Sequence, residues 1–339
     1  MSKIAFFEVK PWEKNYLKKK LQKHKTIFFE EPLNNDNVEK IKDVEIISTF
    51  IYSKIDIQVI KKLKKLSMIV TRSTGTDHIN LKECKKRKIS VCNVPSYGSN
   101  TVAEHTFALI LSISRNVHKS YVRTRRGDFS IEGLTGFDLK DKTIGIIGGG
   151  QIGMHVARIA KGFGMKTLVF DINKNMFMSE ILNYKYVSLD ELLRNSDIIT
   201  LHTPYTKQTY HLINKENIKI IKKGAIIINT ARGGLIDTDA LFYALEKKII
   251  RGAGLDAIEG EELIREENQL FHEKNNIETW MKIVRDHKIF NMENVVFTMH
   301  NAFNSKEALQ KILDTTIENI EMCPGKLCKN NNLITKYVK

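Results

Sequence analysis

The chain has 339 residues, of which 42% are hydrophobic and 8% aromatic, so it is neither disordered nor fibrous and is long enough for two domains with sizeable cores. Its formal net charge is +15, but 42 of its 54 basic residues are Lys. Because Arg is the residue that makes bidentate contacts to phosphates and bases, this Lys-rich excess indicates a solvated surface and disfavours nucleic acid or a membrane as the partner.

Residues 1–99 alternate short apolar runs with Lys-rich amphipathic segments such as IQVIKKLKKL. This is the pattern of parallel βαβ units. Five strands are predicted here, in the segments KIAFFEV, TIFFEE, EIISTFI, MIVTRS and SVCNV. The segment carries a net charge of +10, against +3 for residues 100–300 and +2 for residues 301–339.

From Asn100 the pattern changes. The run NTVAEHTFALILSISRN predicts a long helix, with Thr101 and Glu104 spaced as a capping box. Six strands with helical crossovers follow, at 143–147, 166–170, 197–201, 225–229, 252–255 and 295–299. This succession predicts a doubly wound parallel sheet of the Rossmann type.

The four cysteines are Cys84, Cys92, Cys323 and Cys328. None has partners at zinc-site spacing, so we expect free thiols and no metal. The apolar run near the N-terminus is too short for a signal peptide, and no stretch approaches 18 apolar residues. We therefore expect a soluble, cytoplasmic protein.

Gly148, Gly150 and Gly153 form a GxGxxG motif directly after the strand at 143–147. In such motifs the glycines allow a tight turn, the approach of a pyrophosphate and close helix packing. Asp171 ends the next strand, where a carboxylate binds a ribose 2′-OH and repels a 2′-phosphate. The combination predicts NAD as the cofactor, although Lys174 nearby leaves NADP as an alternative.

Further polar residues fall at or just past the carboxyl ends of the predicted strands, where open α/β sheets bind their ligands. They are His202, Thr230, Arg232, Asp256, Glu261 and His300. His300 ends the last strand, and a hydride-transfer enzyme needs a proton donor that titrates near neutrality. Glu261 would orient its ring and favour imidazolium, and Arg232 would hold a substrate carboxylate. The alternative is that these are surface charges and a histidine that caps a strand.

Several motifs resemble the D-isomer-specific 2-hydroxyacid dehydrogenases. They are NVPSYGSNTVAEH (93–105), GGGQIG, TARGGLID (230–237), GLDAIEGEE (254–262) and MHNAF (299–303). The stretch RTRRGDFSIEGLTGFDLKDKTIGIIGGGQIG is most similar to the fermentative D-lactate dehydrogenases. One departure is Ile258, where the family usually has an aromatic residue.

This resemblance implies the roles of individual residues. Arg232 would bind the 2-oxo acid, His300 would protonate its carbonyl, and Glu261 would pair with that histidine. Thr74, Gly75 and Tyr97 would contact the substrate. The remaining cofactor contacts would come from Gln151, Ile152, Thr203, Pro204, Thr209, Thr230, Ala231 and Asp256.

The resemblance also implies the domain organisation. A smaller flavodoxin-like α/β substrate domain, residues 1–99 and 301–339, would be interrupted by the NAD-binding Rossmann domain at 100–300. The expected activity is NADH-dependent reduction of pyruvate to D-lactate. A larger branched or aromatic 2-oxo acid, or an NAD-sensing protein similar to transcriptional co-repressors, is the alternative. A homodimer or tetramer is expected, since the family usually forms such oligomers and the helix at 101–116 is more apolar than one buried face needs.

Overall fold

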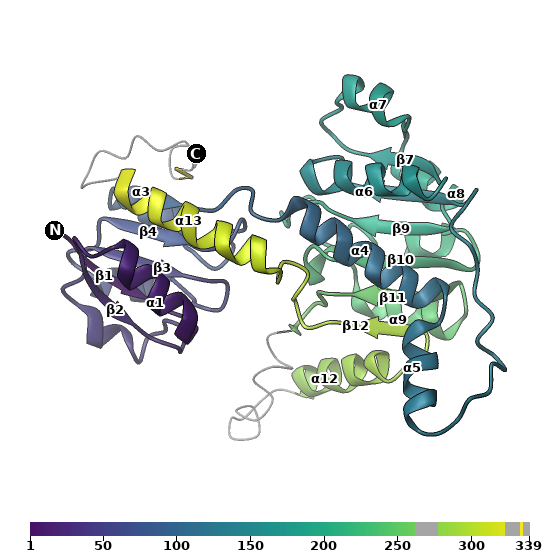
Figure 1. Cartoon of the computed structure of the whole chain (residues 1–339), viewed down its shortest axis with the longest axis horizontal. Coiled ribbons are helices and arrows are strands. Elements are labelled where there is room, and N and C mark those ends of the chain that lie inside the picture. Colours follow the sequence, from purple (N-terminus) through teal and green to yellow (C-terminus); the bar gives the residue numbers. More distant parts are fainter. Residues whose placement is uncertain (262–276, 323–332, 335–339) are drawn as a thin grey trace. The chain divides into compact units, whose positions relative to one another are not determined.

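The computed structural model describes residues 1–261, 277–322 and 333–334 (Figure 1). The chain forms two compact units. Unit 1 comprises Met1–Gly98 and Ser305–Lys339, and unit 2 comprises Ser99–Asn304. Across the described residues, no helix has the length and apolar character needed to cross a membrane. Cys84 and Cys92 are buried, while Cys323 and Cys328 lie outside the described residues.

Unit 1 contains a five-stranded parallel sheet in the order β2-β1-β3-β4-β5, which is the flavodoxin-like order. The strands are β1 (Lys3–Phe6), β2 (Lys25–Phe28), β3 (Ile46–Thr49), β4 (Met68–Thr71) and β5 (Ser90–Cys92). The helices are α1 (Pro11–Lys20), η1 (Val38–Ile41), α2 (Ile57–Lys62), α3 (Leu81–Lys86) and α13 (Lys306–Met322).

Both faces of this sheet are covered, which is why its strands are apolar on both sides. On one face, Leu17 of α1 and Leu313 of α13 pack against Phe6 and its neighbours. On the other face, Val59 of α2 and Cys84 of α3 join a second apolar cluster. The C-terminal helix thus completes the core that the N-terminal segment begins.

Unit 2 contains a seven-stranded parallel sheet in the order β12-β11-β10-β9-β6-β7-β8. The strands are β6 (Thr143–Ile147), β7 (Lys166–Phe170), β8 (Lys185–Tyr186), β9 (Ile198–Leu201), β10 (Ala225–Asn229), β11 (Ile250–Leu255) and β12 (Val295–Phe297). The strand order reverses between β6 and β9, as it does in doubly wound dinucleotide-binding folds. The predicted α/β fold class is confirmed.

Helices lie on both faces of the second sheet (Figure 1). α4 and α6 pack on one face, and α8, α9 and α12 on the other. The helices of unit 2 are α4 (Ser99–Ser114), α5 (Val117–Arg125), α6 (Gln151–Gly162), α7 (Met176–Leu182), α8 (Leu189–Asn195), η2 (Asn217–Ile220), η3 (Gly233–Leu235), α9 (Thr238–Glu246) and α12 (Ile277–Phe290).

Three details differ from the sequence analysis. α4 begins at Ser99, so Thr101 lies within the helix and the predicted capping box is wrong. The apolar residues of α4, including Phe107 and Ile110, are buried within unit 2, so its apolar excess does not indicate a partner subunit. β8 was not predicted, because its two residues are too few to give an alternating pattern in the sequence.

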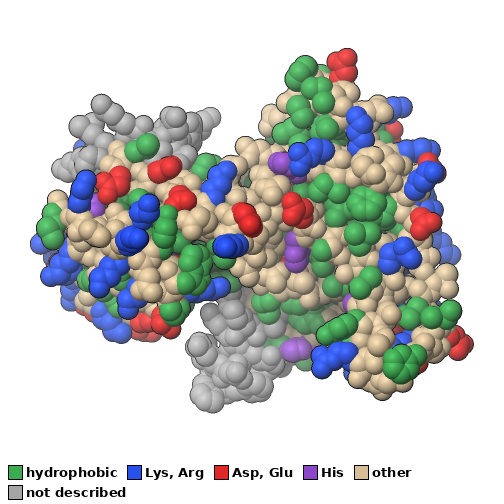
Figure 2. Space-filling view, in the orientation of Figure 1, with side chains coloured by type: hydrophobic (Ala, Val, Ile, Leu, Met, Phe, Trp, Pro, Cys, Tyr) green, Lys and Arg blue, Asp and Glu red, His purple; other side chains and the backbone are tan. Residues whose placement is uncertain are grey.

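The Lys-rich surface of unit 1 is mixed with other side chains (Figure 2). Lys3 pairs with Asp43 at 2.6 Å, and Lys42 and Lys62 pair with Glu39. Exposed pairs of this kind contribute little to stability, because water and salt screen the two charges. Such side chains form a solvated face with local charge neutralisation.

Candidate active site

The loop between β6 and α6 contains the three glycines of the predicted motif. Gly148 has a φ of +104°, and a Cβ atom there would lie 2.7 Å from the His202 carbonyl group. A Cβ atom at Gly153 would lie 2.0 Å from the Gly148 carbonyl oxygen, so this packing requires glycine. At Gly150, the residue before α6, a Cβ atom would meet no atom of the described chain within 4 Å. The N-terminus of α6, where backbone N–H groups attract anions, therefore borders open space.

Asp171 follows β7 and lies against this loop. Its Oδ2 accepts a hydrogen bond from the Gly149 N–H at 2.6 Å, and its Oδ1 accepts one from the Asn173 N–H at 2.7 Å. Lys174 places its Nζ 6.0 Å from the centre of the Tyr186 ring. The carboxylate predicted to bind ribose is thus fixed beside the glycine loop.

The segment after β9 begins with two polar residues, His202 and Thr203. The Nε2 of His202 lies 2.9 Å from the Thr200 hydroxyl. Because burial lowers the pKa of His202 to about 3, its imidazole is neutral at neutral pH and supplies no proton. The His202 Nδ1 and the Thr203 hydroxyl are buried without a hydrogen-bond partner among the described residues, which is uncommon for buried polar atoms and fits a site for a polar ligand. Further along, the Thr209 hydroxyl donates to the Pro204 carbonyl oxygen at 2.7 Å.

The segment after β10 contains Thr230, Ala231 and Arg232. The Thr230 hydroxyl lies 3.0 Å from the hydroxyl of Thr106 on α4. The Nη1 of Arg232 donates to the Ala231 carbonyl oxygen at 2.9 Å, and the Asn229 side chain donates to the Arg232 carbonyl oxygen at 3.0 Å. These bonds hold the backbone of the arginine at the end of a buried strand.

The loops after β10 and β11 touch through their backbones. A Cβ atom at Gly233 would lie 2.1 Å from the Ile258 carbonyl group and 2.4 Å from the Glu259 nitrogen. The Asn229 side chain also donates to the Ala257 carbonyl oxygen at 3.3 Å. The position of the arginine loop is therefore coupled to that of the loop that carries Glu261.

Asp256, at the end of β11, lies under the turn that carries His300. Its Oδ1 accepts hydrogen bonds from the Thr298 hydroxyl at 2.6 Å and the Asn301 N–H at 2.9 Å, and its Oδ2 accepts one from the Ala302 N–H at 2.9 Å. His105 of α4 places its Nε2 3.0 Å from the same hydroxyl and 3.5 Å from Oδ1. A carboxylate with this many donors fixes the shape of the turn.

His300 has a φ of +47°, which is uncommon for a residue other than glycine. Its backbone N–H donates to the Asp256 carbonyl oxygen, and its Nδ1 lies 2.7 Å from the Glu261 Oε1. Because a carboxylate only accepts, Nδ1 carries the hydrogen and Nε2 is the atom that can exchange a proton. The Glu261 Oε2 accepts in turn from the Ile258 N–H at 3.3 Å. The structure thus brings together the predicted histidine and glutamate.

In unit 1 the predicted residues follow β4 and β5. The Thr74 hydroxyl donates to the Val94 carbonyl oxygen at 2.8 Å, and the Ser73 hydroxyl donates to the Gly75 carbonyl oxygen at 2.7 Å. Tyr97 is half-buried at the end of the same segment. The loops at the carboxyl ends of the two strands are therefore joined to each other.

Comparison with known proteins identifies the family. The NAD-binding domain of the D-isomer specific 2-hydroxyacid dehydrogenases matches residues 107–302. A 2-hydroxyacid dehydrogenase homolog of Haemophilus influenzae is 37% identical over 97% of this chain and 98% of its own length. The chain belongs to the D-isomer specific 2-hydroxyacid dehydrogenase family. It is therefore an NAD-dependent oxidoreductase.

Two further members of this dehydrogenase family are similar over nearly their whole length. D-lactate dehydrogenase of Escherichia coli is 35% identical over 96% of this chain and 99% of its own. The crystal structure of D-lactate dehydrogenase from Aquifex aeolicus, complexed with NAD and lactic acid, is 35% identical, with a TM-score of 0.84 and 94% of each chain covered. The open N-terminus of α6 and the adjacent Asp171 carboxylate of the present dehydrogenase fit NAD.

Several residues that support the site were not predicted from the sequence. His105 and Thr298 contact Asp256, and His211 contacts Glu259. His105 lies within a motif quoted for the resemblance, but its contact joins residues 193 positions apart. Nothing in local spacing indicates such a pair.

Proposed function

We propose that this dehydrogenase reduces pyruvate to D-lactate with NADH. The proposal rests on the contact between the His300 Nδ1 and the Glu261 Oε1, which are 2.7 Å apart. The two residues follow β12 and β11, which are neighbouring strands of the sheet. Its relatives named D-lactate dehydrogenases support the choice of substrate. NADH, when bound, supplies the hydride that reduces the carbonyl carbon.

The cofactor would be held by residues at the carboxyl ends of β6, β7, β9 and β10. The first turn of α6 would bind the pyrophosphate, and Asp171 would bind the ribose hydroxyls. The residues we assign to cofactor binding are Gly148, Gly150, Gln151, Ile152, Gly153, Asp171, Thr203, Pro204, Thr209, Thr230, Ala231 and Asp256. The Asp256 carboxylate, which accepts hydrogen bonds from Thr298, Asn301 and Ala302, would also hold the turn that carries His300.

The substrate would be held and protonated by Arg232 and His300. The guanidinium of Arg232 would bind the carboxylate of the 2-oxo acid through paired hydrogen bonds. Protonated His300, with Nδ1 bound to Glu261, would give the Nε2 proton to the carbonyl oxygen. Hydride on carbon and proton on oxygen together convert the ketone to an alcohol. Such proton donation is worth about 10²–10⁴ in rate.

The remaining assignments follow from these roles. Unit 2 would be the NAD-binding domain and unit 1 the substrate domain, in which Thr74, Gly75 and Tyr97 contact the substrate. The buried thiols of Cys84 and Cys92 suit a reducing compartment such as the cytoplasm. Assembly into a homodimer or tetramer is part of the proposal.

The oxidation of NADH in the presence of a panel of 2-oxo acids tests the proposal. We expect pyruvate to give the highest kcat/KM and a D-lactate product on chiral chromatography. A higher value for a branched or aromatic 2-oxo acid would assign another substrate within the same family. NADH binding without turnover of any 2-oxo acid would favour a sensing protein and refute the proposal.

A further inference from the structure

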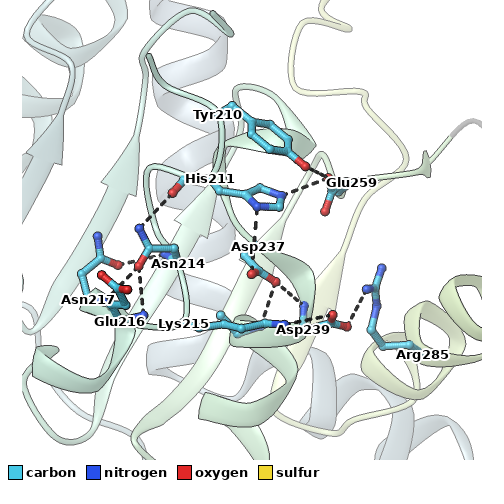
Figure 3. A network of polar contacts seen from close by, with 11 residues as sticks. Tyr210, His211, Asn214, Lys215, Glu216, Asn217, Asp237, Asp239, Glu259 and Arg285 are labelled. Carbon is cyan, nitrogen blue, oxygen red and sulfur yellow. Dashed lines mark hydrogen bonds and ion pairs between the residues drawn. The ribbon is translucent and has the colours of Figure 1, made fainter. Parts of the chain in front are cut away.

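A network of polar side chains lies beside the loop that carries Glu261 (Figure 3). His211 has its Nε2 3.0 Å from the Glu259 Oε1, and its Nδ1 4.0 Å from the Asp237 Oδ2. The Tyr210 ring stacks on the His211 ring at 3.8 Å, and its hydroxyl donates to the same Glu259 oxygen at 3.3 Å. Because a carboxylate only accepts, the His211 Nε2 donates to Glu259.

The backbone of His211 is fixed to the segment that follows Arg232. The His211 N–H donates to the Gly234 carbonyl oxygen at 2.9 Å, and Ile213 forms a parallel bridge with Ile236. His211 has a φ of +49°, a conformation that costs free energy in a residue other than glycine and marks a constrained position. The main chain of His211 thus contacts the loop after β10, and its side chain contacts the loop after β11.

Glu259 and Glu261 belong to one tight turn. The Glu261 N–H donates to the Ile258 carbonyl oxygen at 3.2 Å, and the Ile258 N–H donates to the Glu261 Oε2 at 3.3 Å. On the other side, Gly233 is packed against the backbone of Ile258 and Glu259. A shift of Glu259 therefore displaces the turn whose side chain contacts His300.

The outer part of the network restrains the supports of this turn. Arg285 of α12 donates to the Asp239 carboxylate at 2.7 Å and to Asp286 at 3.0 Å, and Lys215 lies 3.6 Å from Asp239 (Figure 3). Asp237 accepts from the first N–H groups of α9. These contacts join the loop after His211 to α9 and α12, so His211 lies between these elements and the Glu261 turn.

We propose that His211 is a positioning residue: by holding Glu259, it keeps Glu261 in contact with His300. The expected effect of His211 on kcat rests on the proposed function. The structural consequence, a turn held in place by one imidazole, is independent of the substrate.

The kinetic test uses His211→Ala in two backgrounds. His211→Ala removes the hydrogen bond from His211 to the charged Glu259 carboxylate. We therefore expect kcat to fall about tenfold and the dissociation constant for NADH to stay unchanged. His211→Gln, which keeps a side-chain donor, should recover most of the loss. In a Glu261→Gln background, His211→Ala should cost less than about twofold, because the contact it supports is already weakened. Equal losses in both backgrounds, or an unchanged kcat, would overturn the inference.

The control is His118→Ala, which removes a half-buried histidine elsewhere in unit 2 whose ring nitrogens lie 3.0 and 2.9 Å from two carbonyl oxygens. We expect its kcat to stay at the wild-type value. Hydrogen–deuterium exchange gives a readout besides turnover: the N–H groups of Ile258 and Glu261 should exchange faster in His211→Ala than in His118→Ala. Unchanged exchange in His211→Ala would refute the positioning role, whatever the activity of the wild-type protein. Absence of turnover of any 2-oxo acid by the wild-type protein would instead refute the proposed function and leave the exchange test valid.

Discussion

Replacing Gly233 by alanine tests whether the contact between two loops sets the geometry of the site. The added Cβ would lie 2.1 Å from the Ile258 carbonyl group, whereas an ordinary contact is at least 3.4 Å. The atoms it meets are backbone, so a side-chain rotation cannot relieve the clash. The two loops must therefore separate by more than 1 Å, and the turn that carries Glu261 must move with them.

The size of the effect follows from the His300–Glu261 contact, which is 2.7 Å long and breaks if the turn moves by such a distance. A displacement of about 1 Å in an active site can cost about 10² in rate, or roughly 2.7 kcal/mol of transition-state stabilisation. We expect Gly233→Ala to lower kcat/KM for the 2-oxo acid by about this factor. NADH binding should change less than kcat/KM, because the loop at Gly148–Gly153 and Asp171 lie apart from the displaced loop, which holds only Thr230 and Ala231 of the assigned cofactor residues.

The assay is steady-state oxidation of NADH, with fluorescence titration for the NADH dissociation constant. Gly162→Ala is the matched control, since a Cβ atom there meets nothing within 4 Å and the residue ends α6. We expect this variant to keep its activity within about twofold, because alanine is favoured over glycine in helices. Wild-type kcat/KM in Gly233→Ala, or an equal loss in both variants, would refute the reasoning.

Four other predictions follow from the structure. Asp171→Ala should weaken NADH binding and remove the preference for NADH over NADPH; an unchanged preference contradicts the assignment. Arg232→Lys should raise KM for the 2-oxo acid and lower kcat, since a point charge cannot replace the guanidinium fork; unchanged kinetics would count against this role. Burial raises the pKa of Cys84 and Cys92 to about 12. In a variant with the other two cysteines changed to serine, a thiol reagent at pH 8 should therefore label only unfolded protein. Rapid labelling of the native protein would contradict the burial of these two thiols. Burial also raises the pKa of Asp286 to about 6, so the folded state loses stability as the pH rises from about 4 through 6. In urea unfolding, the free energy of unfolding of Asp286→Asn should therefore rise relative to wild type by up to about 3 kcal/mol across that interval. A difference between the two proteins that does not change with pH would refute the pKa shift.

The sequence predicted the strands well because buried parallel strands carry an unambiguous signal. The run at Ala225–Asn229 is buried throughout, and continuous β-branched residues between loops are typical of such strands. Helix limits were harder to predict. The amphipathic segment IQVIKKLKKL is helical only over Ile57–Lys62, although Leu63 and Leu66 beyond the helix lie in the same apolar cluster as Val59.

The residues proposed to carry the chemistry could be selected from the sequence because each follows a strand, and parallel strands present their carboxyl ends at one edge. His300 and Glu261 are 39 positions apart in the sequence, and their pairing was predicted from their shared placement past the ends of strands and from the family resemblance. The supports of that pair could not be predicted. Contacts such as His105 with Thr298 depend on the register of a helix over a sheet, which no local pattern encodes.

The most direct test of the account is the turnover of His300→Ala. Protein with this change should bind NADH as wild type does and show a kcat for pyruvate lower by about 10²–10⁴, with Glu261→Gln intermediate. His118→Ala, treated identically, should match wild type. A His300→Ala variant that reduces pyruvate at the wild-type rate would contradict the proposal that this histidine supplies the proton.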